Sequence, residues 1–195
     1  MARSLLLIFG GLLAALHAQT TGLEFNSERI AITVQEHACR VTGEYHFRNH
    51  SPQPVTGFPL FYPFPVSPEL PFPDSILIVN GRTGAAAPYS RIGSGILFHI
   101  AVSPMGHSTY TVHYRQPAPA RRFEYILETT QKWQQPLASA EFEITVPNTM
   151  TLTGLSLDVD RLQESDSAHT YHITRQNFMP DANLIIQWEM SHHEP

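Results

Sequence analysis

Lysine and cysteine are almost missing from this chain of 195 residues: Lys132 is its only lysine and Cys39 its only cysteine. A single cysteine cannot form an internal disulfide, so the fold must be held together by its core. The chain has 12 Lys and Arg against 17 Asp and Glu, a formal net charge of −5. Because it has neither a basic excess nor a basic cluster, nucleic acid and anionic membrane surfaces are not expected partners.

Long hydrophobic runs are also missing, apart from one near the start, Leu5 to Leu16, which follows the early cation Arg3. This run has about 12 residues, whereas a membrane-spanning helix needs about 20. A cation, a short apolar run and then small polar residues are typical of a secretory signal peptide. We predict a signal peptide at residues 1–18, cleaved after Ala18, and therefore a secreted or periplasmic protein of net charge −6. No lipid anchor and no membrane span are expected after cleavage.

The sequence shows little of the periodicity of helices. Instead, apolar and polar residues alternate with a period of two. Between Cys39 and Arg48, apolar and polar residues alternate without a break, which is typical of a strand with one buried face. Nine further segments of similar length are separated by turn-forming clusters. The weak helical signal at 158–168 supports a single turn at most. The sequence predicts an all-β fold, an antiparallel β-sandwich of about ten strands with little or no helix after the signal peptide. One domain at residues 19–190 and a flexible tail at 191–195 are expected.

Arrangements that carry catalysis or bind metals are hard to find. Ten histidines follow the predicted leader, but their strand positions put most of them beside polar residues, on wet faces. The acidic stretch at 158–167 lacks the glycine of a tight calcium loop. Gly93-Ser94-Gly95 is too short for a nucleophile elbow and fits a tight hairpin better. Cys39 has the inward register of a buried apolar residue. No catalytic residue, metal site or cofactor is predicted, although carboxylates brought together by the fold stay possible.

One segment, Gly57 to Asp74, holds six prolines and five aromatic rings in eighteen residues. Its flanks are predicted strands, and its intervening residues are apolar. We therefore predict an extended crossover or edge segment that packs its rings into the core, because proline cannot join a central strand. If the rings prove exposed together, they become a binding surface. The candidate binding residues are Tyr62, Phe64 and Phe72 from this segment, together with Trp133 in the loop between two later strands.

Two stretches resemble known families. The stretch 41–63 has Tyr45, Phe47 and Asn49 at alternate positions of an extended strand, followed by a Phe-Pro-Leu element that begins at Phe58. It is similar to the start of the vault and inter-alpha-trypsin (VIT) type of domain and to uncharacterised bacterial secreted families. The stretch 123–147, a tryptophan loop before an alternating strand, resembles an element of those secreted families. The resemblance implies a β-sandwich involved in interactions, and no catalytic residue carries over.

These observations favour binding over catalysis. The sequence predicts a secreted or periplasmic, non-catalytic β-sandwich interaction module that binds a protein or a cell-envelope component. The first alternative is a carbohydrate-binding module that uses exposed aromatic residues, and the second is a hydrolase whose carboxylates are assembled by the fold. Histidine protonation near pH 6.5 suggests a separate hypothesis of pH-responsive binding.

Overall fold

The computed structural model describes residues 22–191, which form thirteen strands and one short 3-10 helix, η1 (Glu128–Trp133). The predicted leader at 1–18 and nearly all of the predicted tail lie outside the described residues. The all-β prediction is confirmed. Within residues 22–191, no helix is long and apolar enough to cross a membrane.

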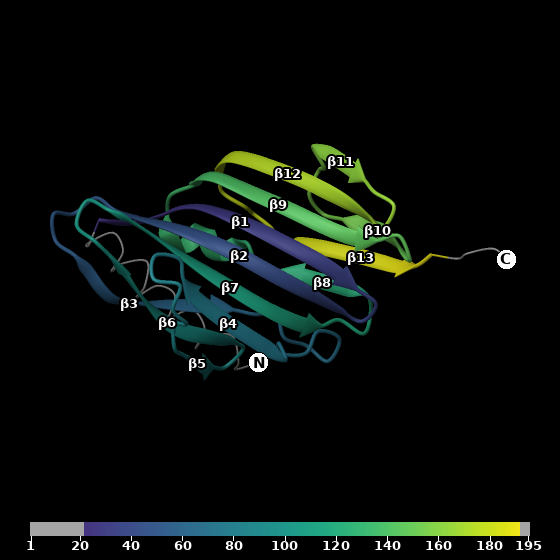
Figure 1. Cartoon of the computed structure of the whole chain (residues 1–195), viewed down its shortest axis with the longest axis horizontal. Coiled ribbons are helices and arrows are strands. Elements are labelled where there is room, and N and C mark those ends of the chain that lie inside the picture. The colour runs from purple at the N-terminus through teal and green to yellow at the C-terminus, as the bar shows by residue number, and fades with distance from the viewer. Residues whose placement is uncertain (1–21, 192–195) are drawn as a thin grey trace.

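The strands form one long sheet and two small ones (Figure 1). In spatial order, the long sheet consists of β11 (Arg161–Glu164), β12 (Ala168–Phe178), β9 (Leu137–Pro147), β1 (Leu23–Gln35), β2 (Ala38–Asn49), β7 (His107–Pro117) and β4 (Ser75–Asn80). One small sheet consists of β10 (Met150–Leu155), β13 (Leu184–Met190) and β8 (Arg122–Tyr125). The other consists of β3 (Val55–Pro63), β6 (Gly95–Val102) and β5 (Tyr89–Ile92).

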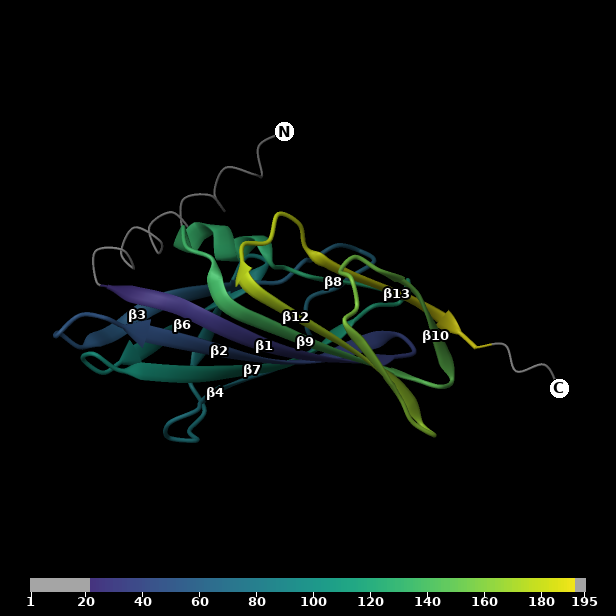
Figure 2. The ribbon, with the colours of Figure 1, turned by 90° about the horizontal axis from the view of Figure 1, so that it is seen from above.

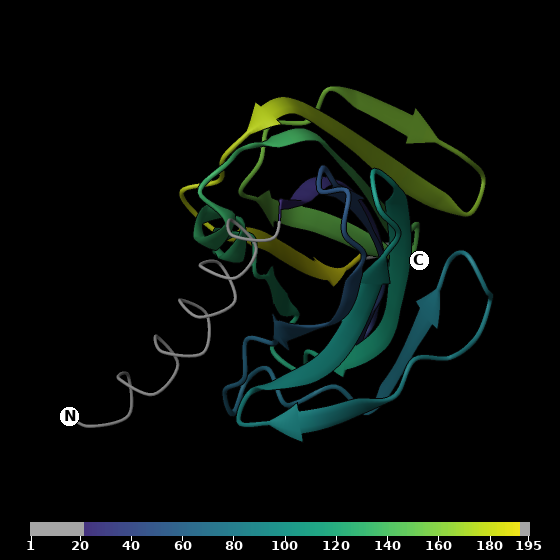
Figure 3. The same ribbon diagram turned by 90° about the vertical axis from the view of Figure 1, so that its left-hand side faces the viewer.

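Both small sheets and η1 lie on one side of the long sheet (Figures 2 and 3). The long sheet therefore has an inner face that carries the core and an outer face in contact with solvent. Alternation produces these faces: in β2, Cys39, Val41, Tyr45 and Phe47 are buried. The polar residues between them are more exposed, namely Arg40, Thr42, Glu44 and His46. The inward register predicted for Cys39 is confirmed. One continuous apolar core joins the three sheets.

Three strands were not among the ten expected from the sequence: β3, β5 and β11. β11 corrects the prediction of at most one helical turn, because Arg161 to Glu164 pair with β12 at the edge of the long sheet. There, ladder hydrogen bonds outweigh a weak helical tendency. The pairing of β1 with β9 is parallel, in contrast to the predicted antiparallel arrangement. A long return through the two small sheets makes this pairing possible, since parallel neighbours need a crossover connection.

The proline-rich segment behaves as predicted. Its first part forms β3, an edge strand, and Phe58, Tyr62 and Phe64 are buried. Beyond β3, the segment is fastened to the long sheet by Gln116 of β7. This buried side chain donates hydrogen bonds of 2.9 Å to the carbonyl oxygens of both Pro65 and Pro71. The segment therefore forms part of the scaffold, and it builds one wall of the cavity described next.

Candidate functional site

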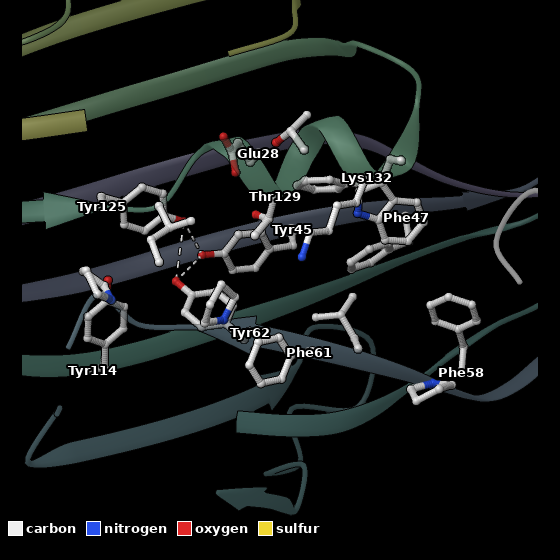
Figure 4. A pocket seen from close by; sticks show the side chains of 18 residues that line it. Glu28, Tyr45, Phe47, Phe58, Phe61, Tyr62, Tyr114, Tyr125, Thr129 and Lys132 are labelled. Carbon is white, nitrogen blue, oxygen red and sulfur yellow. Dashed lines mark hydrogen bonds between the residues drawn. The ribbon is translucent and has the colours of Figure 1, made fainter. Parts of the chain in front are cut away.

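A cavity of about 90 Å³ lies between the inner face of the long sheet, strand β3 and helix η1. Eighteen residues line it, and most of them are apolar or aromatic (Figure 4). Its floor comes from β1, β2 and β7, one wall from β3, and its rim from η1 and the end of β8. A volume of this size accepts several water molecules or a small organic group.

Tyrosine hydroxyl groups meet at the floor of the cavity. The hydroxyl of Tyr45 lies 2.6 Å from that of Tyr125 and 2.8 Å from that of Tyr62, and the latter two are 3.5 Å apart. Figure 4 shows the three hydroxyls pointing toward one another from three different strands. Burial raises the pKa of all three, and of neighbouring Tyr114, well above its ordinary value of 10. The hydroxyls therefore stay neutral and supply hydrogen bonds.

Gly43 decides how the Tyr45 ring lies. A Cβ atom built on Gly43 would collide with the ring and hydroxyl of Tyr45, two residues along the same face of β2. The ring therefore lies over the glycine, along its own strand, which carries its hydroxyl toward Tyr62 and Tyr125. A larger residue at position 43 would close this space.

Glu28 is a buried acid beside this cluster. A β-bulge between Phe25 and Ser27 shifts the register of β1, so that Glu28 shares the inner face with Phe25 on one side and Ile30 on the other. Its side chain lines the cavity opposite Tyr45, and its Oε1 atom has no hydrogen-bond partner. Only 5% of the residue is exposed. Burial raises the pKa of Glu28 from 4.5 to about 8, because a carboxylate loses its hydration there.

Helix η1 forms the rim of the cavity. Asn183 holds its start: the side-chain oxygen accepts hydrogen bonds from the backbone N–H groups of Leu127 and Glu128. Gln131 ties the same helix to the carbonyl oxygen of Pro180. The helix therefore places four residues at the cavity: Thr129, Thr130, exposed Lys132 and half-buried Trp133.

Trp133 belongs to an aromatic cluster. Its ring centroid lies 5.8 Å from that of Phe25, 5.9 Å from Phe47 and 6.1 Å from Phe58. These separations are typical of favourable aromatic pairs. The cluster joins β1, β2, β3 and η1, and it gives the cavity an apolar wall beside Glu28.

The structure brings together two of the four predicted binding residues. Trp133 and Tyr62 both line the cavity. Phe64 lies behind Tyr62, fully buried, with ring centroids 5.2 Å apart. Phe72 is half-buried on the far side of Phe64, where the Arg91 guanidinium lies 3.7 Å from its ring centroid. Tyr62, Phe64 and Phe72 therefore form a row of ring contacts, in which Phe64 and Phe72 support the cavity from behind. Trp133 is joined to this row only through other rings.

Glu28, Tyr125 and Lys132 line the cavity but were not predicted as site residues. The alternation pattern indicates the position of Glu28, because residues 28, 30 and 32 lie on the same face of a strand. Glu28 is therefore expected to face inward together with Ile30 and Ile32. An acid in that register is unusual, and buried ionisable groups gather at functional sites. No sequence signal places Tyr125 against Tyr45, because 80 residues separate them.

Several kinds of chemistry are not supported by this geometry. Glu28 is the only acidic residue that lines the cavity in the described part of the chain, so a pair of carboxylates is not present there. Over residues 22–191, no group of three or more His, Cys, Asp or Glu side chains is placed to hold a metal ion. Burial raises the pKa of the Cys39 thiol far above its ordinary value, which makes this cysteine unreactive.

A family model described as a domain of unknown function (DUF4424) matches residues 108–186. This segment begins in β7 and ends in β13, and it contains the rim of the cavity but not β1 or β2. The match fits the predicted relation to uncharacterised families, whereas the resemblance to the VIT type of domain stays a prediction. No curated protein sequence matches the chain.

Solved structures share the fold. A protein from Legionella pneumophila, provisionally described as nutrient-binding, has a TM-score of 0.63 and 14% identity, over 86% of this chain and 67% of its own. An M1 zinc metallopeptidase from Deinococcus radiodurans has a TM-score of 0.52 and 12% identity, over 85% of this chain. The match spans only 42% of the metallopeptidase. At such identities the likeness is one of fold: the chain shares an all-β fold with these proteins, and its residues 108–186 match an uncharacterised domain type.

Proposed function

We propose that this protein is a secreted or periplasmic binding module that takes a small apolar, ring-bearing group of its partner into the tyrosine-lined cavity. The partner is a cell-envelope component or a protein that displays such a group. One observation carries the proposal: a buried acid with an unpaired oxygen lines a cavity whose other lining residues are mostly apolar or aromatic. Unpaired buried polar atoms are rare, and a partner that supplies the missing hydrogen bond accounts for this one.

Binding is better supported than catalysis. The tyrosines are held neutral, and the single acid of the cavity lacks a second carboxylate or a nucleophile at hydrogen-bond distance. An apolar cavity with a few convergent polar groups is typical of ligand-binding sites. The protein from Legionella pneumophila, with the same fold and a description of nutrient binding, agrees with a binding role.

The carbohydrate alternative receives less support. Sugar-stacking platforms need exposed aromatic faces, yet Tyr62 is buried and Trp133 packs against three other rings. The cavity, at about 90 Å³, is also too small to enclose an oligosaccharide. A ring of the partner that packs against Trp133 fits the dimensions better.

The proposal is tested by fluorescence of Trp133 in a Trp188→Phe background, which leaves one reporting tryptophan. Small ring compounds such as benzyl alcohol and 2-phenylethanol should change its emission saturably. Thr129→Phe, which fills the rim from η1, should abolish the change, whereas Tyr89→Ala, at an exposed ring on β5, should leave it intact. An unchanged emission with every ring compound, or an equal response in Thr129→Phe, would refute the cavity as the site.

A further inference from the structure

No basic side chain in the described part of the chain pairs with the acid in the cavity. Within residues 22–191, the ion pairs join other residues, and Glu28 takes part in none of them. Lys132, the only lysine, extends from η1 toward the cavity but likewise forms no ion pair (Figure 4). A cation that enters the cavity would therefore not have to displace an existing ion pair at Glu28.

The wall next to Glu28 is suited to a positive charge. Tyr45 lies opposite Glu28 across the β1–β2 ladder, and the ring of Phe25 lies 6.1 Å from that of Tyr45 and 5.4 Å from that of Phe47. Aromatic faces carry negative charge density and attract organic cations, most strongly where water is excluded. A cation in this part of the cavity is therefore attracted both by the Glu28 carboxylate and by the aromatic faces. A neutral hydroxyl group is attracted less strongly by either of them.

We propose that the group received by the cavity carries an organic ammonium, which pairs with Glu28 while its apolar body packs against Phe25, Phe47 and Trp133. This inference rests on the proposed function and names the chemical class of its ligand. A primary amine joined to a ring through a short chain is the simplest member of that class. The ammonium would donate hydrogen bonds to the Glu28 carboxylate and to the tyrosine hydroxyls.

The pH dependence of binding distinguishes an ammonium from a neutral donor. The other titratable groups that line the cavity are Tyr45, Tyr62, Tyr114 and Tyr125 from the strands and Lys132 from η1. The buried tyrosines stay neutral between pH 6 and 8. In the empty cavity Glu28 is protonated at neutral pH, so an ammonium must expel that proton. Its affinity should rise about tenfold for each pH unit from pH 6 to 7.5, then level off near pH 8. A neutral alcohol should bind equally well at pH 6 and 7 and weaken above pH 8.

The experiment compares 2-phenylethylamine with 2-phenylethanol, which has nearly the same shape, by isothermal titration of the purified protein at pH 6, 7 and 8. We expect the amine to bind at least tenfold more tightly than the alcohol at pH 8. In Glu28→Gln, which keeps the shape of the side chain, the amine should lose this advantage and its pH dependence. Lys132→Met should bind the amine equally or more tightly, because it removes a competing cation.

The outcomes separate the two proposals. If the alcohol binds as tightly as the amine at pH 8, or if Glu28→Gln keeps the preference, the ammonium inference fails while the binding function stands. If Lys132→Met abolishes amine binding, the ligand is held by the rim and the inference is wrong. If neither compound binds at any pH, the cavity is not the site and both proposals fall.

Discussion

The two ends of strand β1 have the same backbone and the same inner face, but they enclose different interiors. At the C-terminal end of β1, which turns into β2, the side chains of Ile30, Ile32 and Val34 are buried in an aliphatic core. At the other end, Phe25 and Glu28 face an open cavity with tyrosine hydroxyls. The end with Ile30, Ile32 and Val34 therefore contributes to stability through close packing. The end with Phe25 and Glu28 is less closely packed and leaves one oxygen of Glu28 without a hydrogen bond. Such a contrast along one strand is expected where a fold carries a site.

The largest expected effect comes from the aliphatic end. Phe142→Ala removes a buried ring on the inner face of β9, which packs against Phe178 at 6.1 Å between centroids. We expect the free energy of unfolding to fall by about 3–5 kcal/mol, because the lost burial adds to the cost of a cavity. Urea denaturation measures the loss, and ligand binding by the folded fraction should be unchanged. A fall below 1 kcal/mol would mean that this end is not the main source of stability.

Glu28→Gln should have a large effect that depends on pH. An acid with a pKa of about 8 in the folded state and 4.5 when unfolded takes up a proton on folding. Its presence therefore makes the folded state less stable as pH rises from 4.5 to 8, by roughly 1.4 kcal/mol per pH unit. Between pH 5 and 7.5, Glu28→Gln should gain roughly 3 kcal/mol relative to the wild type. Denaturation at both pH values checks this, with the exposed Glu141→Gln as the control that should show no such gain.

A smaller effect is expected for Gly43→Ala, which tests how the cavity floor is built. The added methyl group would meet the Tyr45 ring, and such overpacking costs about 1–3 kcal/mol. The displaced ring should also separate the three hydroxyls and weaken binding. Thermal unfolding and titration of Gly43→Ala can be compared with Arg40→Ala, at an exposed position of the same strand. Equal behaviour of the two variants would contradict the role assigned to this glycine.

The smallest effect should come from Tyr125→Phe. It removes one hydroxyl but leaves Tyr45 hydrogen-bonded to Tyr62, so stability should fall by about 1 kcal/mol. Tyr89→Phe removes a hydroxyl from an exposed tyrosine and should change stability very little. If both variants behave alike, the cluster contributes no more than a solvent-exposed hydroxyl.

Much of the fold follows from alternation in the sequence. The run from Cys39 to Arg48 could be assigned to one strand, and Cys39 could be placed on its inner face. Both assignments hold, since β2 spans this run and Cys39 is fully buried. What alternation cannot supply is the partner of each strand. Pairing depends on how the chain returns through the small sheets, and this is why the parallel neighbours β1 and β9 were missed.

The candidate site was found only in part for the same reason. Aromatic residues with a turn or proline nearby stand out in the sequence, so Trp133 and Tyr62 were recognised. Glu28 is recognised as a site residue only from its surroundings. An acidic residue on a strand is ordinary unless the face on which it lies is known to be buried. Tyr45, Tyr62 and Tyr125 come from three strands, and their meeting is a property of the tertiary structure alone.

The parallel pairing of β1 and β9 also affects how the protein is made. Strands β1 and β2 leave the ribosome early as a hairpin, but β9 begins at Leu137, about 100 residues after β1 ends at Gln35. At 5–20 residues per second, roughly 5–20 s pass before the partner of β1 exists. During that time one side of β1, with its row of free N–H and C=O groups, is open to any other extended chain. Strand β1 is central in the folded sheet, but during synthesis it is an exposed edge strand. A chaperone that prevents aggregation of the nascent chain is therefore expected to act on this edge.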